Sequence, residues 1–259
     1  MNTELDIPKV EILGVTGIPE VHSGFPIGLG ITKACGTGGI SIDDGDVVVV
    51  TQKIVSKSED RIVCLNNVLP TDDAAEFAAV SGRDPRLIQL VLNESKSIVR
   101  KDIQRGILIT ETHHGFICAN SGIDTSNVPG EDMASLLPKD PDISARRIRE
   151  EIKNGTKGPS VGVVISDTFG RAWREGHINH AIGLAGINAF KDYRGIYDAV
   201  GKIMNATMIA YVDELASAAE LVMAKTSGVP VAIVKGYEFQ PGDQGLRSLL
   251  RAKSDDLFR

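Results

Sequence analysis

The run Val161-Gly-Val-Val-Ile-Ser-Asp-Thr-Phe-Gly-Arg171 joins an apolar stretch to a polar one. Its first five residues are typical of a buried strand, and Asp167 and Thr168 follow shortly after it. A second run, Gly115-Phe-Ile-Cys-Ala-Asn-Ser-Gly-Ile-Asp-Thr-Ser-Asn127, has the same order, with Asp124 in its polar part. Both runs predict a loop just beyond a strand end, which is where α/β proteins usually build their sites.

The two polar segments, Asn120–Asn127 and Ser166–Arg171, each combine an Asp with hydroxyl groups and a Gly. Hard oxygen ligands of this kind suit Mg²⁺ or Mn²⁺ bound to phosphates. The same residue types also close strands as ordinary Asx turns. The residues by themselves therefore leave a metal site and a pair of structural turns as alternatives.

The rest of the chain alternates between strand-like and helix-like segments, which predicts an α/β or α+β fold with a mixed sheet. We expect a buried strand at Val47–Thr51, a late strand at Val229–Val234, and a hairpin made by 107–112 and 115–118. Helices are expected from Thr71 to Ala79, from Asp84 to Glu94, over Ile143–Lys153 and over Asp213–Lys225. We interpret residues 1–259 as one domain, with a two-lobed arrangement as the alternative.

The composition is that of an ordinary globular protein, with 42% hydrophobic and 24% charged residues. The formal net charge is −6 and no basic stripe is present, which argues against a nucleic-acid partner. No apolar run approaches the roughly 20 residues of a membrane span, and Met1–Asp6 shows no signal-peptide pattern. Cys35, Cys64 and Cys118 are far apart, and we interpret them as reduced core residues of a cytoplasmic protein.

Several other patterns do not amount to a site. The P-loop signature is absent. The glycine-rich stretches Gly28–Gly30 and Gly36–Gly39 miss the dinucleotide fingerprint, and we expect turns there. His177 and His180, next to Glu175, lack the spacing of zinc proteases, so we expect structural or substrate-facing histidines. No Gly-x-Ser-x-Gly elbow or other activated nucleophile is visible.

Three long stretches together resemble the coenzyme F-420-0:L-glutamate ligase family, the γ-glutamyl ligases of the deazaflavin cofactor. The stretches are Gly45–Lys57, Gly115–Val128 and Ser166–Gly176, and the likeness extends from about Gly17 to about Gly236. It implies a GTP-dependent ligase that adds L-glutamate to coenzyme F-420-0 by a γ-glutamyl amide bond. It also implies two Mg²⁺ or Mn²⁺ ions, a monovalent cation such as K⁺ as a further candidate, and a homodimer.

The resemblance also assigns roles to individual residues. It implies that Asp124, Asp167 and Thr168 hold the metal, with both Asp residues catalytic, and that the nucleotide contacts Ile18, Pro19, Glu20, Val21, Gln52, Lys53, Lys57 and Asn127. The residue types agree with this assignment, because carboxylates are the main protein ligands of such ions and a hydroxyl group is a neutral supplement. Arg171 and Arg174 flank Trp173 and would suit the phosphodiester or carboxylate of the substrate.

The chain departs from the family pattern at two places. Asp60 stands where the family has a Gly, and the stretch from Ala224 to Pro230 is shorter and poorer in Gly than the nucleotide loop of archaeal members. This leaves GTP against ATP open. A metal-dependent phosphohydrolase with the same Asp residues is the alternative function, and a non-catalytic binder of phosphorylated ligands is a third. Some relatives continue into a nitroreductase-like domain, which we do not expect here.

Overall fold

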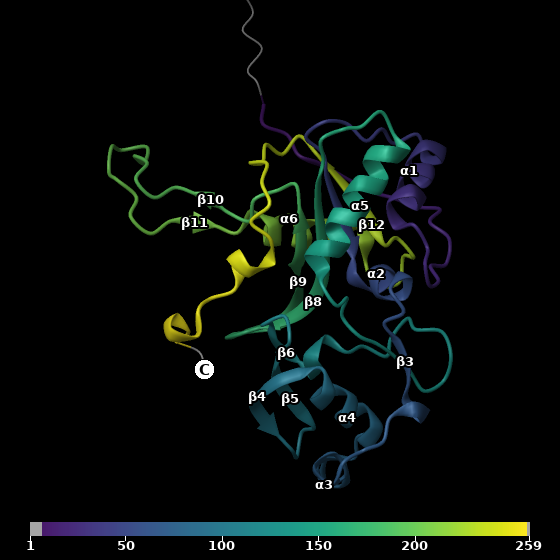
Figure 1. Cartoon of the computed structure of the whole chain (residues 1–259). Coiled ribbons are helices and arrows are strands. Elements are labelled where there is room, and N and C mark those ends of the chain that lie inside the picture. Colours follow the sequence, from purple (N-terminus) through teal and green to yellow (C-terminus); the bar gives the residue numbers. More distant parts are fainter. Residues whose placement is uncertain (1–6, 258–259) are drawn as a thin grey trace, which may run out of the picture.

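The computed structural model describes residues 7–257, so Met1–Asp6 lies outside the described residues. Its centre is a five-stranded sheet in the order β1-β12-β2-β8-β9 (Figure 1). The strands are β1 (Glu11–Gly14), β12 (Val231–Lys235), β2 (Val47–Thr51), β8 (Gly162–Arg171) and β9 (Arg174–Ala185). Only β2 and β8 are parallel, and the other neighbours are antiparallel. The expected mixed sheet in an α/β fold is confirmed.

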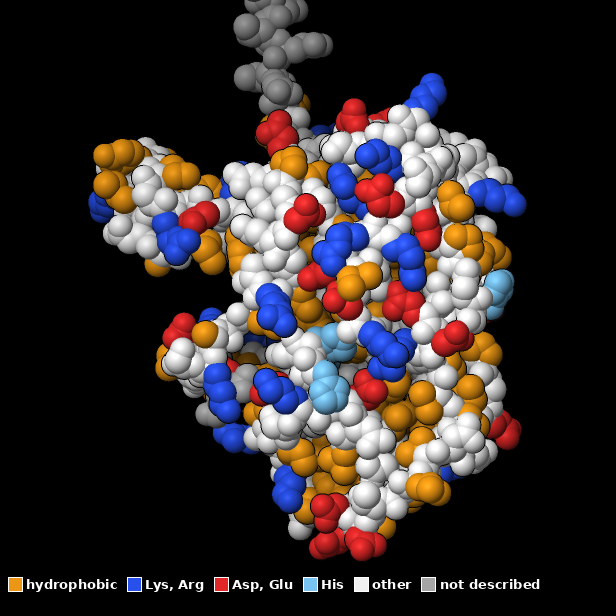
Figure 2. Space-filling model, in the orientation of Figure 1, with side chains coloured by type: hydrophobic (Ala, Val, Ile, Leu, Met, Phe, Trp, Pro, Cys, Tyr) orange, Lys and Arg blue, Asp and Glu red, His pale blue; other side chains and the backbone are white. Residues whose placement is uncertain are grey.

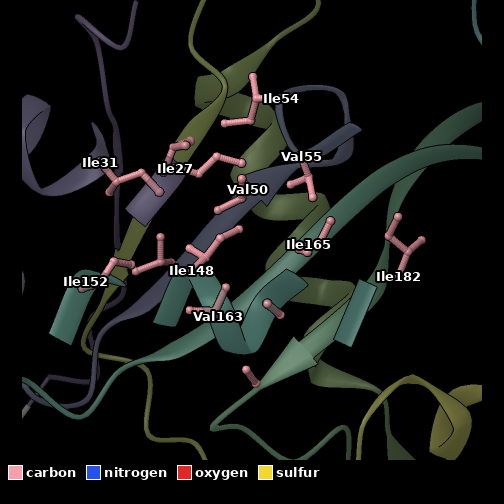
Figure 3. Close-up of a cluster of buried hydrophobic side chains, with 14 of the residues drawn as sticks. Ile27, Ile31, Val50, Ile54, Val55, Ile148, Ile152, Val163, Ile165 and Ile182 are labelled. Carbon is pink, nitrogen blue, oxygen red and sulfur yellow. The ribbon is translucent and has the colours of Figure 1, made fainter. Parts of the chain in front are cut away.

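Helices cover both faces of this sheet because its strands are apolar on both sides. Val48 and Val50 of β2 face helices α1 (Ile27–Gly38) and α5 (Pro141–Gly155), where they join the cluster drawn in Figure 3. Val47 and Val49 face helix α6 (Tyr211–Met223) on the other side. The run of four valines is therefore buried on both faces, as its composition predicts.

A smaller group of elements lies below the central sheet in Figure 1. It contains the three-stranded sheet β4 (Ser95–Asp102), β5 (Ile107–Thr112) and β6 (Ile117–Ala119), with helices α3 (Asp72–Ser81) and α4 (Pro85–Asn93). Phe77 and Ile88 of the two helices pack on Leu108 of β5. A two-stranded sheet of β3 (Ile62–Cys64) and β7 (Met133–Ser135) connects this group to α2 (Gln52–Ser58). The expected hairpin of β5 and β6 is confirmed.

A long arm leaves the central sheet between β9 and α6, and its strands are β10 (Lys191–Asp192) and β11 (Met208–Ile209). In Figure 1 it extends far to the left of the body. Its far end exposes the large apolar side chains of Ile196, Tyr197 and Val200.

Two local expectations are wrong. The glycines of Gly28–Gly30 and Gly36–Gly39 do not form turns, because residues 27–38 are helix α1 and only Gly39 has a left-handed backbone. The glycines at 28 and 30 serve close packing instead. A Cβ at Gly28 would lie 2.5 Å from Cβ of Glu151 on α5, and one at Gly30 would lie 2.6 Å from the Phe25 ring.

The second wrong expectation concerns Ser166–Arg171, which is not a loop. Strand β8 continues to Arg171 because its polar half pairs with β9, from Ser166↔Ala181 to Arg171↔Arg174. Phe169 in the middle of this ribbon packs on the core beside Phe116, at 5.8 Å between ring centroids. The ribbon is thus anchored by an apolar contact, and Asp167 and Thr168 lie on a strand.

Candidate active site

The candidate site is an open cavity of about 550 Å³ at the end of β2 and along the near half of the β8–β9 ribbon. It is built by segments that are far apart in the sequence: the irregular stretch 18–21, helix α2, residues 127–129, the β8–β9 ribbon, and the C-terminal half of α6 with the loop after it. The parallel pairing of β2 with β8 places Thr51 beside Ser166. The first residue of α2 and Asp167 therefore follow at the same end of the two strands.

Asp124 is held in place by its own loop and by α2. Asn120 and Ser121 adopt left-handed backbone conformations that turn the chain after β6. The Asp124 carboxylate then accepts hydrogen bonds from the backbone N–H of Ser126 at 2.7 Å and from its hydroxyl at 2.9 Å. Lys53 Nζ of α2 lies 2.6 Å from the same carboxylate. This loop is an Asx turn, and it also presents a carboxylate toward Lys53 and Asp167.

The two carboxylates have pKa values shifted in opposite directions. Burial raises the pKa of Asp167 to about 7, and the negative charge of Asp124 adds to this effect, while Lys225 and Lys53 oppose it. Burial also acts upward on Asp124, but the hydrogen bonds from Lys53 and Ser126 outweigh it and hold the pKa of Asp124 below its ordinary value. The electrostatic coupling shows that the two side chains share one environment.

A chain of polar side chains continues from Thr168 across the ribbon to α6. Thr168 Oγ1 donates to Asn179 Oδ1 at 2.7 Å, and Asn179 Nδ2 donates to Glu220 Oε2 at 3.0 Å. Lys225 Nζ donates to Thr168 Oγ1 at 2.8 Å. Asn179, Glu220 and Lys225 all line the cavity.

None of these three residues stands in a sequence pattern that predicts a site. Asn179 sits between the two histidines that drew attention, and its role depends on the register that places it opposite Thr168. Lys225 lies in the stretch that departs from the family pattern. Glu220 has the pattern of a surface carboxylate on a helix, and nothing in the sequence indicates that it lines the cavity.

Most of the residues expected to contact a nucleotide also line the cavity. Ile18, Pro19, Glu20, Val21, Lys53, Lys57 and Asn127 line the cavity. Lys57 Nζ pairs with Glu20 at 2.5 Å, which joins α2 to the irregular stretch. Asn127 Nδ2 donates to the Lys225 carbonyl at 3.4 Å, so it joins the two loops at the rim.

Gln52 is placed differently from its expected partners. Its side chain is only 1% exposed, and its Oε1 accepts a hydrogen bond from Ser56 within α2. It is not among the residues that line the cavity. The side chain therefore points away from the open space that Lys53 and Lys57 face.

Both arginines and His177 lie farther along the ribbon, whereas His180 is the cross-strand partner of Asp167. Arg171 and Arg174 are opposite each other at its tip, outside the cavity. His177 is exposed, and His180 stacks on Phe169 with 5.8 Å between ring centroids. Among residues 7–257, no three His, Cys, Asp or Glu side chains gather closely enough to hold a metal by themselves.

The donor set nevertheless fits a small hard cation. Mg²⁺ usually binds through one or two carboxylates and takes its remaining ligands from water and substrate phosphates. Asp124 and Asp167 supply two carboxylates, and Thr168 adds a hydroxyl oxygen. Burial is the main cause of the raised pKa of Asp167, and a cation bound there would favour the ionised carboxylate.

A family model described as F420-0:Gamma-glutamyl ligase matches residues 16–236. A protein of Methanothermobacter thermautotrophicus named "Coenzyme F420:L-glutamate ligase" is 40% identical over 253 residues, which cover 96% of this chain and 99% of that protein. The proteins of the same name from Methanocaldococcus jannaschii and Methanopyrus kandleri are 40% and 39% identical, covering 97% and 84% of this chain and 97% and 87% of those proteins.

None of the helices within residues 7–257 is long and apolar enough to cross a membrane.

Proposed function

Because this chain belongs to the F420-0:gamma-glutamyl ligase family, we propose that it joins L-glutamate to coenzyme F-420-0 in a reaction that consumes GTP and requires a divalent cation. The bond formed is an amide between the amine of glutamate and a carboxylate of the acceptor, and it is of the γ-glutamyl type when that carboxylate is the γ-carboxylate of a glutamate already attached. The observation that carries the proposal is the convergence, in one cavity, of three lysines with Asp167 and Thr168 and with the Asp124 that Lys53 binds.

The chemistry requires that a poorly reactive carboxylate be activated. The γ-phosphoryl group of the nucleotide passes to a carboxylate oxygen of the acceptor, and the nucleoside diphosphate leaves. The amine of glutamate, having lost a proton, then attacks the acyl carbon, and inorganic phosphate departs with that oxygen. Such a reaction needs alignment and neutralisation of phosphate charge more than a protein nucleophile.

The residues divide this work along the cavity. Lys53, Lys57 and Lys225 supply positive charge to phosphate oxygens, which a chain of net charge −6 must concentrate locally. Asp124 and Asp167, with Thr168, would hold Mg²⁺ or Mn²⁺, and Glu220 and Asn179 fix the orientation of the Thr168 hydroxyl. When bound, the cation neutralises the charge that develops on the transferring phosphoryl group.

The nucleotide lies against the wall formed by residues 18–21 and Asn127 in this proposal. The backbone of the irregular stretch 18–21 offers N–H and C=O groups to the base, and Lys57 reaches the phosphates after it separates from Glu20. GTP is the nucleotide that the resemblance implies. A preference for ATP would show that the shorter stretch 224–230 changes base choice.

A metal-dependent phosphohydrolase would use the same Asp residues without glutamate. The direct test is mass spectrometry of F-420-0 incubated with the protein, GTP, MgCl₂ and L-glutamate. We expect a mass gain in whole glutamyl units, which is lost when glutamate, nucleotide or metal is omitted. Release of phosphate at the same rate with and without glutamate, and no mass gain, would favour the hydrolase.

The proposal includes a cytoplasmic homodimer. The three cysteines are unpaired, as in proteins of reducing compartments. The arm of β10 and β11 exposes Ile196, Tyr197, Val200 and Ile203 at its far end, and Figure 2 shows this end as a hydrophobic patch away from the body. Exposed patches of this kind mark association sites. Light scattering should give about twice the mass of 27.7 kDa, and Val200→Asp combined with Tyr197→Asp should give monomers.

A further inference from the structure

The tip of the β8–β9 ribbon carries features that the chemistry at Asp167 does not explain. Arg171 and Arg174 are direct cross-strand partners. Like charges opposite each other destabilise a sheet. Arg171 Nη2 donates to the Glu175 carbonyl at 3.1 Å, and neither arginine forms an ion pair with an acidic side chain in the described part of the chain. An anion placed between the guanidinium groups would offset their repulsion.

Trp173 sits between the two arginines in the turn. Its side chain is 85% exposed, and its backbone has a φ of 65°. A bulky residue in the left-handed region is an outlier, and such strained positions cluster at binding sites. The turn presents a large flat ring to solvent beside two cationic groups, which is the arrangement that recognises a planar aromatic molecule with an attached phosphate.

The ribbon also sets the distance from this tip to the reacting centre. Asp167 and Arg171 are four positions apart along β8, which corresponds to about 13 Å in an extended strand. Phe169 lies between them, and it is fixed by contacts with Phe116 and His180. The ribbon is therefore an anchored surface that runs from the proposed metal residues to the Trp173 turn.

We infer that the β8–β9 ribbon is the binding surface for the acceptor. The deazaflavin ring stacks on Trp173, and the phosphodiester lies between Arg171 and Arg174. The carboxylate of the acceptor is directed toward Asp167 and Thr168. This inference rests on the proposed function, because that function supplies the deazaflavin as acceptor. It leaves the nucleotide on the other side of Thr168, along α2 and residues 18–21. The two substrates would then meet at Asp167 from opposite directions.

The chain contains a single tryptophan, which allows a test without turnover. The protein is labelled with 5-fluorotryptophan, so that one ¹⁹F resonance reports on Trp173. Adding F-420-0 without nucleotide should shift this resonance, because a stacked ring changes its magnetic environment. Adding GTP and Mg²⁺ alone should leave it in place. A resonance that does not move with saturating F-420-0 would overturn the inference.

Calorimetry with variants separates the ring from the arginines. Trp173→Ala should raise the Kd for F-420-0 on the order of 10-fold, whereas Trp173→Phe should stay within about threefold of wild type. Arg171→Ala and Arg174→Ala should weaken F-420-0 but not the deazaflavin riboside, which lacks the phosphodiester and the carboxylate. Arg105→Ala, at another exposed hairpin turn, is the matched control and should bind as wild type does.

The outcomes distinguish the inference from the proposed function. Glutamyl transfer by the wild type, together with unchanged F-420-0 binding in Trp173→Ala, would overturn the inference and leave the ligase. A shifted ¹⁹F resonance and weaker F-420-0 binding by the variants, without any glutamyl product, would support the ribbon as the binding surface and overturn the proposed ligase activity. A wild-type protein that binds no F-420-0 would overturn both.

Discussion

Lys53, which lines the candidate site, forms an ion pair of 2.6 Å with Asp124, although one is expected to bind nucleotide and the other metal. The same ammonium group donates to the hydroxyl and carbonyl oxygens of Ser126. Lys53 therefore neutralises the charge of the Asp124 carboxylate. A cation that binds Asp124 has to share it with this lysine or displace it, and the released ammonium group can then turn to phosphate.

Lys53→Met should consequently separate cation binding from catalysis. Without the competing ammonium group, Asp124 should bind Mn²⁺ several-fold more tightly in the absence of nucleotide, because a nearby positive charge has been removed. Nucleotide affinity and turnover should both fall. Calorimetric titration of Mn²⁺ measures the first effect, and weaker Mn²⁺ binding in the variant would show that Lys53 supports the metal site and does not compete with it.

Asp124→Asn and Asp167→Asn each replace a charged oxygen ligand by a neutral one of the same size. Turnover should fall by at least a hundredfold, while the unfolding transition remains cooperative, because neither side chain belongs to the apolar core. Glutamyl transfer is assayed across a range of Mg²⁺ concentrations. Near-normal activity of both variants at saturating Mg²⁺ would remove the two residues from the metal site. Asp102→Asn, at the end of β4 and outside the cavity, is the control.

Glu20 and Lys57 should have opposite effects on nucleotide binding. Lys57→Ala removes one charge-assisted contact and should weaken GTP binding by about 1.5–3 kcal/mol. Glu20→Gln frees Lys57 from its 2.5 Å partner and should strengthen GTP binding. Calorimetry with GTP and ATP measures both. Unchanged GTP binding in Lys57→Ala would place this lysine outside the nucleotide site, and a preference for ATP would show that the 224–230 loop alters base choice.

The pKa of Asp167 predicts a pH dependence of stability in the metal-free protein. Asp167 ionises near its ordinary pKa of 3.8 in the unfolded chain and at about 7 in the folded one. Between these values the folded state holds a proton that the unfolded state has lost, so the contribution of Asp167 to stability is largest below about pH 4 and falls as the pH rises to about 7. The loss is at most about 4 kcal/mol.

Urea unfolding at pH 5 and pH 8 measures this effect, with Asp167→Asn as the comparison because it cannot ionise. The variant should gain stability relative to wild type as the pH rises, and saturating Mg²⁺ should reduce the difference at pH 8. An equal difference between the two proteins at both pH values would show that Asp167 is already ionised at pH 5.

The order of bond formation can be followed with isotopes. If the acceptor carboxylate attacks the γ-phosphorus atom, ¹⁸O in that carboxylate should appear in inorganic phosphate, one atom per amide bond. The prediction rests on the absence of an activated Ser or Cys among the residues that line the cavity. Label retained wholly in the deazaflavin product, or a phosphorylated protein trapped during turnover, would contradict the acyl-phosphate route.

Much of the fold could be predicted because apolar pattern and burial coincide in it. The Val47–Thr51 run has no polar residue to turn toward solvent, and it is buried on both faces. Helix α1 could not be predicted, because its glycines disfavour helix in isolation. These glycines fit in a helix because Gly28 packs against α5 and Gly30 packs against the Phe25 ring. Helix α5 is more than a hundred residues away in the sequence, so no local pattern reveals this packing.

The candidate site also combines residues that a local pattern predicts with residues that depend on distant contacts. Asp124, Asp167 and Thr168 stand in recognisable runs, so the likeness to a family was enough to select them. Asn179 and Glu220 reach the cavity only through strand register and helix packing, which no local pattern encodes. Strand β8 was expected to end at Ile165, because polar residues usually leave a sheet. It continues because β9 pairs with it and Phe169 anchors it.

The strand order β1-β12-β2 has a consequence for how the chain is made. Strand β12 fills the place between β1 and β2, and Glu11 pairs with Lys235. At translation rates of about 5–20 residues per second, β1 waits roughly 10–45 s on the ribosome for β12, the strand next to it in the described sheet. During that time one edge of β2 is an open, valine-rich template. An unpaired strand edge of this kind can pair with another chain until β12 covers it.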